Sequence, residues 1–449
     1  MFVDPKMLMR LDRAVPRYTS YPTALQFHPM DEAVYKEHLA NIGTEPISLY
    51  IHIPFCRSMC LFCGCSVVLN RRPERQSAYV EDLLQEIRLV AELVKKAPVS
   101  QLHFGGGTPT SLNSTEFEQI FSLLRSSFDF TERAELSIEI DPRTVYADGG
   151  EKLQLLRRLG CNRVSFGVQD LDPKVQEAVK RRQSKEMSLQ TFEMARSLGF
   201  DGINLDLIYG LPFQTVESFT KTVLEISSWK PDRIALFSYA KIPWLKKHQQ
   251  AIPEETLPTT EEKFAIYAEA RSLFLAHGYT AIGMDHFSLS EDSLSLGYRE
   301  GKLYRNFQGY SLHLANHMIG LGVSSVGFVS GAYFQNTKQL EQYAQSVESR
   351  LLPVSRGVLL NGEDRLRHWV IQELMCRFEV DKKKCEQLFR INFDTHFRKA
   401  PLQPLKDEGL LEETSDKLLA TPLGHLFIRL IASAFDGYLT ESSTYSKLI

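Results

Sequence analysis

The sequence predicts an α/β protein built around six parallel strands. Short apolar segments alternate with amphipathic helical segments from about residue 46 onward, and the end of each apolar segment carries polar or glycine-rich residues. Such alternation is typical of a parallel sheet with helical connections. The predicted strands are Ser48–Ile53, Gln101–Phe104, Glu135–Ile140, Arg163–Val168, Ile203–Ile208 and Arg233–Ser238. Periodicity alone does not distinguish an open sheet from a barrel.

Two of the connecting segments have the clear periodicity of helices. Residues Tyr79–Val94 and Thr115–Ser127 place apolar side chains on one helical face. Asn113 precedes the second segment and stands three residues before Glu116, which is the spacing of a capping box. We therefore expect a helix that begins just after Asn113.

The composition is that of an ordinary enzyme-sized protein. The chain has 449 residues, of which 43% are hydrophobic and 24% charged, and this length suggests two or three domains. A net charge of -3 argues against a general nucleic-acid or membrane surface. Residues 1–10 are interrupted by charges and lack the apolar core of a signal peptide. No apolar run reaches the roughly 18 residues of a membrane-spanning helix.

The cysteines do not form a disulfide-like framework, because four of the seven lie between Cys56 and Cys65. Cys161, Cys376 and Cys385 lie in periodic segments, so they are expected to be core thiols. A reducing cytoplasm is the expected setting.

The clustered cysteines follow the apolar run Ile47–Ile53, which Pro54 ends. Cys56, Cys60 and Cys63 have C-x3-C-x2-C spacing. Three thiolates would bind three irons of a cubic 4Fe–4S cluster and leave the fourth open to another ligand. A structural zinc site is the alternative, with Cys65 as a possible fourth ligand. The spacing Cys63-Gly64-Cys65 is too tight for a usual zinc knuckle.

Two other strand ends have both a structural and a functional interpretation. Gly105–Thr110 lacks the dinucleotide-binding spacing, but its three glycines would let a ligand lie against the backbone. A simple tight turn is equally consistent with the residues. Glu139 lies in an apolar strand, where its charge needs a partner, and a structural ion pair would satisfy that need.

At this point the sequence resembles a known family. The three cysteines, with Phe62 before the last, are the signature of radical S-adenosylmethionine enzymes. The longer string from Tyr50 to Cys65 is similar to the oxygen-independent coproporphyrinogen III oxidases. The resemblance implies an α/β fold with a six-stranded partial (β/α) barrel. It implies three segments: an N-terminal arm (1–45), the barrel with its extension (46–350) and a mainly helical, winged-helix-like C-terminal domain (356–449).

The resemblance also implies the ligands of each cofactor. Cys56, Cys60 and Cys63 would bind the 4Fe–4S cluster. A first S-adenosylmethionine, chelated to the cluster, would contact Tyr50, Gly106, Glu139 and Val326. A second molecule would contact Phe62, Gly107, Thr108, Gln169, Arg181, Asp206 and Ala240.

The implied reaction is the oxidative decarboxylation of two propionate side chains of coproporphyrinogen III to vinyl groups, which gives protoporphyrinogen IX. A 5'-deoxyadenosyl radical would abstract a hydrogen from each propionate. Cys65 would transfer a proton or hydrogen atom rather than bind iron. Arg17 and Arg305 are the candidate partners of substrate carboxylates. An electron donor such as flavodoxin or ferredoxin is expected, and the enzyme is expected to be a monomer.

Three further segments have both a structural and a functional interpretation. Composition favours a surface arm for Pro16–Ala24, whereas the resemblance would bring Arg17 towards the active site. His286 could be a core histidine or part of the site. The basic clusters Arg71–Arg75 and Lys180–Lys185 are expected to be mostly solvated, apart from Arg181.

Two other functions use the same scaffold. One is a haem chaperone, and the other is a radical methyltransferase that opens the haem ring. The chaperone branch usually lacks Cys65 and the arm Pro16–Pro22. Both features are present, which favours the oxidase.

Overall fold

The computed structural model describes residues 4–94, 96–312, 316–440 and 445–448, so the first three residues of the N-terminal segment lie outside the described part. The chain forms two compact units. We call Phe27–Leu207 with His313–Leu359 the barrel unit, and Met1–Gln26, Ile208–Leu312 and Leu360–Ile449 the C-terminal unit. Both units are built from separate stretches of sequence, whereas the three predicted segments are each continuous.

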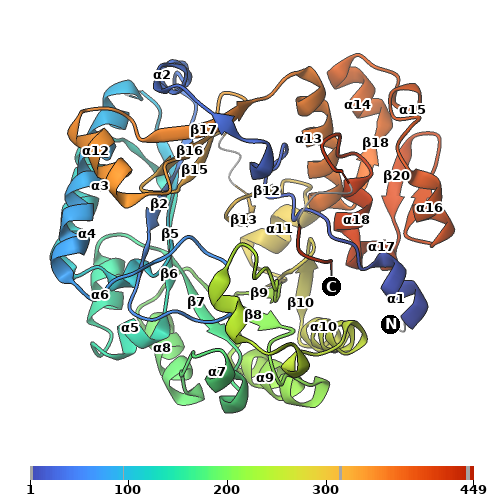
Figure 1. Ribbon diagram of the computed structural model, residues 1–449, viewed down its shortest axis with the longest axis horizontal. Coiled ribbons are helices and arrows are strands. Elements are labelled where there is room, and N and C mark those ends of the chain that lie inside the picture. Colours follow the sequence, from blue (N-terminus) through green and yellow to red (C-terminus); the bar gives the residue numbers. More distant parts are fainter. Residues whose placement is uncertain (1–3, 95, 313–315, 441–444, 449) are drawn as a thin grey trace. The chain divides into compact units, whose positions relative to one another are not determined.

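The barrel unit is organised around a parallel sheet (Figure 1). Five of its strands contain predicted ones, are longer than predicted, and have parallel neighbours: β2 (Ile47–Ile53), β5 (Val99–Gly106), β6 (Phe130–Ile140), β7 (Arg163–Gln169) and β8 (Gly202–Tyr209), the last of which ends in the other unit. β14 (His317–Leu321) also pairs in parallel with β2. The sheet continues through antiparallel strands β15 (Val326–Val329), β16 (Ala332–Asn336), β17 (Val354–Leu359) and β1 (His28–Pro29). The predicted α/β class is confirmed.

Helices connect the parallel strands. They are α3 (Pro73–Leu93), α4 (Ser114–Ser127), α5 (Pro142–Tyr146), α6 (Glu151–Arg158), α7 (Pro173–Ala178) and α8 (Lys185–Ser197), with α2 (Glu32–Ala40) and α12 (Leu340–Glu348) flanking the antiparallel strands. α3 begins six residues before the predicted Tyr79, because Pro73 suits the first helical turn. α4 has the predicted capping box between Asn113 and Glu116.

The strands of the barrel unit separate apolar from polar side chains. In β7, Val164, Phe166 and Val168 are buried, and the residues between them are only partly buried. β8 repeats the pattern, with Asn204 and Asp206 alternating with buried leucines and isoleucine. Because successive side chains point to opposite faces of a strand, one face of the sheet packs on helices and the other carries polar groups.

The C-terminal unit contains the sixth predicted strand, β9 (Arg233–Ser238), with the predicted bounds. It pairs antiparallel with β11 (His286–Leu289), which pairs with β10 (Tyr279–Ile282). The remaining strands are β12 (Tyr304–Asn306) and β13 (Gly309–Ser311), which form a hairpin, and a sheet of β18 (Glu379–Asp381), β20 (Lys417–Ala420) and β19 (Leu411–Glu413). Its helices are α1 (Pro5–Leu11), α9 (Val216–Trp229), α10 (Thr260–Ala276), α11 (Ser293–Arg299), α13 (Gly362–Arg377), α14 (Lys382–Phe389), α15 (Phe393–His396), α16 (Leu402–Asp407), α17 (Pro422–Leu426) and α18 (Ile428–Ser433).

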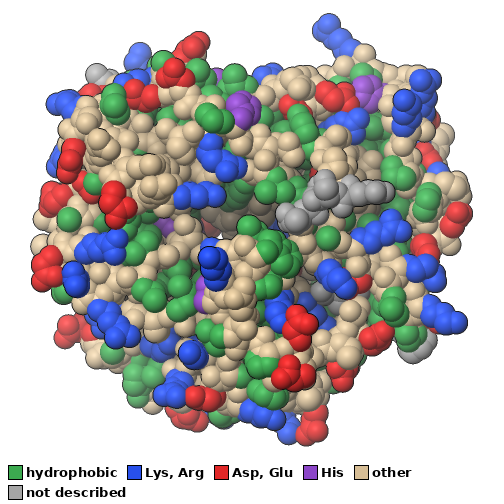
Figure 2. Space-filling view, viewed as in Figure 1, with side chains coloured by type: hydrophobic (Ala, Val, Ile, Leu, Met, Phe, Trp, Pro, Cys, Tyr) green, Lys and Arg blue, Asp and Glu red, His purple; other side chains and the backbone are tan. Residues whose placement is uncertain are grey.

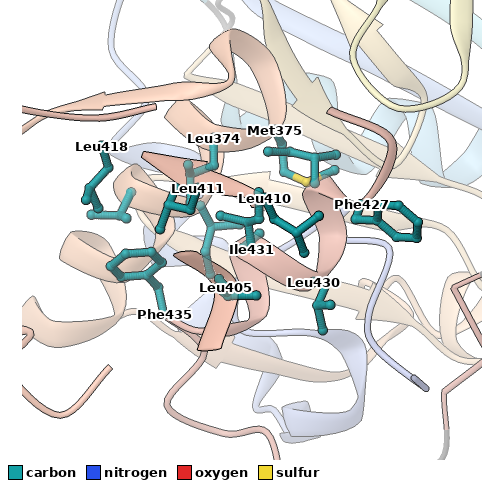
Figure 3. Close-up of a cluster of buried hydrophobic side chains, with 14 of the residues drawn as sticks. Leu374, Met375, Leu405, Leu410, Leu411, Leu418, Phe427, Leu430, Ile431 and Phe435 are labelled. Atoms are coloured by element: carbon teal, nitrogen blue, oxygen red, sulfur yellow. The ribbon is translucent and has the colours of Figure 1, made fainter. Parts of the chain in front are cut away.

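Figure 3 shows part of the apolar core of the C-terminal unit. Leu374 and Met375 of α13 pack against Leu410, Phe427 and Ile431, so helices and the small sheet share one core (Figure 3). From α13 onward the chain forms a helix, a short strand, further helices and then an antiparallel hairpin. This is the order of a winged helix, as predicted.

The segment around Arg17 is not a surface arm. Val15, Tyr18 and Tyr21 are buried in the core of the C-terminal unit. Tyr18 Oη donates a hydrogen bond to Asp436 (3.0 Å), and Tyr21 Oη accepts one from the backbone N–H of Gly437 (2.9 Å). The expectation from composition is wrong here, because the tyrosine rings supply apolar area that the polar count conceals.

The surface and the remaining cysteines agree with the sequence predictions. Basic and acidic side chains are interspersed on the face in Figure 2. Arg71, Arg72 and Arg75 are exposed, as expected. Among the described residues, none of the helices is both long and apolar enough to span a membrane. The three cysteines outside the cluster are all buried: Cys161, Cys376 and Cys385.

Candidate functional site

The cysteine loop (Cys56–Cys65) leaves the sheet at the carboxyl end of β2. It begins in β3 (Phe55–Cys56) and is followed by β4 (Val68–Leu69), which pairs with β3 in parallel. None of the four cysteines forms a disulfide; Cys60 is buried and Cys65 is exposed. The predicted position of the cysteines, on a loop at a strand's carboxyl end, is confirmed.

Each thiol has a distinct environment. Cys56 Sγ lies 3.2 Å from Thr108 Oγ1. Burial raises the pKa of Cys56 to about 11, although this contact with Thr108 lowers it. A hydrogen bond between Cys65 and Cys63 raises the pKa of Cys65 well above its usual range. The loop therefore contacts the glycine-rich turn after β5 through the Cys56 and Thr108 side chains.

A row of polar side chains crosses the sheet beside this loop. Strand register places Tyr50 opposite His103, and His103 opposite Ser137. His103 Nδ1 lies 2.7 Å from Ser137 Oγ, and its Nε2 lies 3.4 Å from Glu139 Oε1. Tyr50 Oη is 3.0 Å from Nδ1 of His52. The sequence analysis assigned no role to His52 or His103, and His103 belongs to no motif there.

Glu139 differs from the expected buried acid. Its side chain is 45% exposed, so its carboxylate retains much of its hydration. Glu139 Oε2 accepts a hydrogen bond from the Gly106 backbone N–H at 3.2 Å. The structural ion-pair interpretation is therefore incomplete, because the carboxylate is partnered by a backbone amide and the His103 ring while it also faces open space.

The glycine-rich turn packs closely on its neighbours. Gly106 has a φ of +118°, which favours glycine. A Cβ on Gly107 would lie 2.6 Å from the carbonyl oxygen of Pro54, and a Cβ on Gly106 would lie 2.7 Å from the His52 ring. Side chains at either position would therefore push the turn away from the start of the cysteine loop.

Two arginines lie next to Cys60. Arg181 Nη1 is 3.6 Å and Arg143 Nη2 is 4.0 Å from the Cys60 Sγ. Asp141 lies between them: Arg143 Nη2 donates to Asp141 Oδ2 at 2.6 Å, and Arg181 Nη1 lies 3.5 Å from the same oxygen. Arg181 is buried although its neighbours Lys180 and Arg182 are exposed. Sequence reasoning assigned no role to Asp141 or Arg143.

The ends of β7 and β8 complete the polar face. Register places Gly167 opposite Asp206. Asp206 Oδ2 accepts a hydrogen bond from Ser165 Oγ (3.1 Å), and its Oδ1 accepts one from Asn204 Nδ2 (2.7 Å). Burial, together with the nearby Glu139 charge, raises the pKa of Asp206 to about 7.

The glycine-rich turn between β14 and β15 lies against the end of β2. A Cβ on Gly322 would lie 2.4 Å from Tyr79 Oη and 2.7 Å from the His52 carbonyl oxygen. Tyr79 Oη donates to that carbonyl at 2.6 Å and accepts from the Val323 N–H at 3.1 Å. Val326, at the start of β15, is partly buried. This turn therefore borders the strand that carries Tyr50.

Of the other predicted residues, Ala240 belongs to the C-terminal unit, and Phe62 and Gln169 belong to the barrel unit. The carbonyl of Ala240, after β9, accepts a hydrogen bond from Gln249 Nε2 at 3.2 Å. Phe62 is partly buried within the cysteine loop. Gln169 closes β7, and its backbone φ is +71°.

Arg17 and Arg305 share one buried acid in the C-terminal unit. Arg17 Nη2 lies 3.1 Å from Asp285 Oδ2, and Arg305 Nη1 lies 3.9 Å from Asp285 Oδ1. Asp285 Oδ1 also lies 2.6 Å from His286 Nδ1. Although burial raises the pKa of Asp285, the adjacent His286, Arg305 and Arg17 hold it well below its usual range. We call these four residues the Asp285 cluster.

The Asp285 cluster is lined by aromatic rings and borders a cavity. The Arg305 guanidinium lies 4.6 Å from the Tyr310 ring centroid, and that of Arg17 lies 5.8 Å from Phe237. The cavity has a volume of about 40 Å³, and Arg17 and Asp285 are among its lining residues. Sequence reasoning named both arginines but not the acid that holds them.

Comparison with known proteins adds to this geometry. Residues 50–226 match the Radical SAM superfamily, and residues 360–427 match the HemN C-terminal domain. The oxygen-independent coproporphyrinogen III oxidase of Salmonella typhimurium is 40% identical over 443 residues, covering 98% of this chain and 96% of that protein. The Helicobacter pylori (strain J99) protein of the same name is 40% identical over 446 residues, covering 97% of each chain. The solved structure of coproporphyrinogen III oxidase from Escherichia coli has a TM-score of 0.91 at 39% identity, covering 95% of this chain and 100% of that one.

The superfamily match contains the cysteine loop and the ends of the five parallel strands that carry the polar row. The chain is therefore a radical S-adenosylmethionine enzyme, a class that uses a 4Fe–4S cluster and S-adenosylmethionine. Identity over nearly the full length narrows the class: the chain belongs to the oxygen-independent coproporphyrinogen III oxidase family.

The described residues fit both cofactors chemically. Three thiols of one loop provide a donor set for an iron–sulfur cluster. Within the part of the chain that the structure describes, no three His, Cys, Asp or Glu side chains converge on one metal ion. A cubic cluster needs no such convergence, because each ligand binds a different iron. In the same part of the chain, buried Gln169 Oε1, Arg181 Nε and Asn204 Oδ1 lack hydrogen-bond partners, and a polar cosubstrate could supply them.

Proposed function

We propose that this enzyme converts coproporphyrinogen III to protoporphyrinogen IX in haem biosynthesis, by oxygen-independent oxidative decarboxylation of two propionate side chains. The observation that carries the proposal is about 40% identity to oxidases of this name over 98% of the chain. It is supported by the three-cysteine loop beside a polar sheet face and by a cluster of basic groups in the C-terminal unit.

The cluster and S-adenosylmethionine, when bound, supply a carbon radical that can abstract hydrogen from an unactivated carbon. We assign the cluster to Cys56, Cys60 and Cys63. The proposal includes two S-adenosylmethionine molecules. The first would contact Tyr50, Gly106, Glu139 and Val326. The second would contact Phe62, Gly107, Thr108, Gln169, Arg181, Asp206 and Ala240.

The chain's own groups explain how a methionine zwitterion and a ribose would be held. The Glu139 carboxylate is half exposed and can accept from an amine, while the Gly106 N–H fixes its orientation. Asp206 is fixed by Ser165 and Asn204, so one edge of its carboxylate is positioned in advance. Such preorganisation reduces the entropy lost when a ligand binds. Cys65 is exposed on the same loop and remains our candidate for proton or hydrogen transfer.

The Asp285 cluster is our candidate site for a substrate propionate. It combines two guanidinium groups, which are always cationic, with one carboxylate, so its formal charge is positive before His286 is counted. Arg305 is 3% exposed, and its Nε and Nη1 atoms have no hydrogen-bond partner among the described residues. A propionate carboxylate would offer the acceptors that these donors need.

Anaerobic incubation of the iron-reconstituted protein with coproporphyrinogen III, S-adenosylmethionine and a reductant tests the proposed reaction. Protoporphyrin formation, with methionine released in proportion, is the expected result. Tight retention of haem without turnover would instead indicate a haem chaperone. A methylated linear tetrapyrrole formed from haem would indicate the ring-opening methyltransferase. Either of these outcomes contradicts the proposal.

A paired substitution tests the propionate site. Arg17→Gln should raise the KM for coproporphyrinogen III about tenfold, because one charged hydrogen-bonded contact contributes roughly 1.4 kcal/mol. Arg10→Gln is the control, because Arg10 is an exposed arginine of the same N-terminal segment that pairs with Glu408. Equal KM values for the two variants would exclude Arg17 from substrate binding.

The same proposal places the enzyme in the cytoplasm as a monomer that receives electrons from a flavodoxin or ferredoxin. None of the seven cysteines, all of them described, forms a disulfide, which supports a reducing compartment. Sedimentation analysis tests the monomeric state, and reduction assays with each purified donor test the electron source.

A further inference from the structure

Arg143 lies where strand β6 gives way to helix α5. Asp141 caps that helix by accepting from the Arg143 backbone N–H at 3.1 Å. The Arg143 side chain turns back to the same carboxylate: Nε donates to Oδ1 at 3.0 Å and Nη2 to Oδ2 at 2.6 Å. Because both ends of the guanidinium edge are held, the position of its positive charge is fixed.

The fixed charge lies beside Cys60. Arg143 Nη2 is 4.0 Å from the Cys60 Sγ, and Arg181 Nη1 approaches the same sulfur to 3.6 Å. Arg181 is held in turn, since its Nη2 donates to the Gly167 carbonyl at 2.5 Å. The side chains of Arg143, Asp141 and Arg181 are 25%, 11% and 9% exposed, so solvent screens their charges only in part.

The charges of Arg143, Arg181 and Asp141 sum to one positive charge beside the Cys60 sulfur. Burial raises the pKa of Asp141, but the Arg181 charge and the Arg143 hydrogen bonds lower it to about 2. The aspartate is therefore ionised at neutral pH, and two guanidinium groups outweigh it. Hydrogen bonds and charges near the sulfur ligands are among the factors that set the potential of an iron–sulfur cluster.

We propose that Arg143 is a positioning residue that makes the cluster easier to reduce, because its guanidinium holds positive charge at the Cys60 sulfur while Asp141 limits that charge. The inference rests on the proposed ligation of the cluster by Cys60. The step concerned is a one-electron reduction of the oxidised cluster by an external donor. Added negative charge on the cluster and its sulfurs is stabilised by a nearby cation, so removing the cation disfavours the reduced form.

The experiment is a potentiometric titration of the reconstituted protein, with dithionite as reductant and the EPR signal of the reduced cluster as readout. Arg143→Gln should lower the ratio of reduced to oxidised cluster at a given potential about tenfold, which corresponds to about 59 mV for one electron. Arg143→Lys keeps the charge and should change the ratio less than Arg143→Gln does. Asp141→Asn removes the opposing charge but still suits a helix N-cap, so it should raise the ratio.

Arg182→Gln is the control, because Arg182 is exposed and pairs with Glu177 on the surface. It should leave the ratio unchanged. Iron analysis precedes each titration: a wild-type protein without a cluster contradicts the proposed function itself. If the wild type holds its cluster and Arg143→Gln titrates like Arg182→Gln, the inference about Arg143 is wrong. If Arg143→Gln does not fold, the titration of Asp141→Asn tests the proposal instead. An unchanged or lowered ratio of reduced to oxidised cluster in Asp141→Asn would overturn it.

Discussion

Two aspartates in this molecule each hold two arginines, and their surroundings differ. Asp141, in the barrel unit, binds Arg143 and lies near Arg181, and both arginines face a cysteine sulfur. Asp285, in the C-terminal unit, has Arg17 and Arg305 as its partners and lies beside a histidine and a cavity. Each site combines two arginines with one aspartate. The group that the arginines face therefore determines what each site can do.

A third buried acid shows what the arginines contribute. Glu86 of α3 is 1% exposed, and its hydrogen-bond donors among the described residues are all neutral: Tyr343 Oη (2.6 Å), the Gly322 N–H (2.6 Å) and Asn336 Nδ2 (2.7 Å). Burial raises the pKa of Glu86 to about 7, although these donors lower it. Neutral donors therefore do not offset desolvation here, whereas cationic partners lower the pKa of Asp141 and Asp285.

The largest expected effect concerns Cys56, a cysteine of the same loop as the Cys60 that Arg143 and Arg181 face. Cys56→Ala should remove the bound iron and reduce activity below detection, because two thiolates on the loop cannot replace the third ligand. Iron analysis and turnover measure both consequences. An active, iron-replete Cys56→Ala protein would contradict the ligand assignment.

The second prediction concerns the Asp285 cluster. Asp285→Asn should destabilise the protein by about 3 kcal/mol, because it leaves the buried Arg305 charge without its counterion. Thermal unfolding measures the change, with Glu254→Gln as control because that carboxylate is exposed and pairs with Lys241. The Asp285 pKa is lowered on folding, so its contribution is present above the unfolded pKa of about 4 and is lost as the pH falls. A variant as stable as the control would show that the pair is not stabilising.

The third prediction concerns Glu86, the buried acid whose described hydrogen-bond donors are neutral. The Glu86 pKa is raised on folding, so its cost to stability appears above the unfolded pKa and grows until the pH passes about 7. Between pH 5.5 and 8 this one group should lower the free energy of unfolding by about 2 kcal/mol. Glu86→Gln should reduce this pH dependence. Unfolding measured at both pH values tests it, and an unchanged pH dependence in the variant would exclude Glu86 as the source.

The smallest expected effect compares two cysteines of one loop. Cys65→Ser should keep its iron and lower turnover by roughly tenfold, a change of about 1.4 kcal/mol, because its assigned role is hydrogen or proton transfer rather than ligation. Iron content and turnover of the reconstituted variant provide the test. Loss of the cluster would make Cys65 a ligand instead.

Sequence patterns predicted the strands well because each strand is a short apolar run, as in β2, or alternates between apolar and polar residues, as in β7. β9 has the predicted bounds. β6 begins at Phe130, before its predicted start, because Glu132 and Arg133 obscure the pattern of the first half of the strand. The cysteine loop was visible from spacing alone. The error at the arm around Tyr18 and Tyr21 has a different cause, since no local pattern reports which core a tyrosine ring enters.

Features that depend on neighbours along the chain could thus be predicted without a structure, among them the thiol spacing and the Asn113 cap. The pairing of charges required the folded chain. Arg17 meets Asp285 across 268 positions, and Arg181 reaches Cys60 across 121. Electrostatic partnership depends on distance in space, which only the packing of strands and helices establishes.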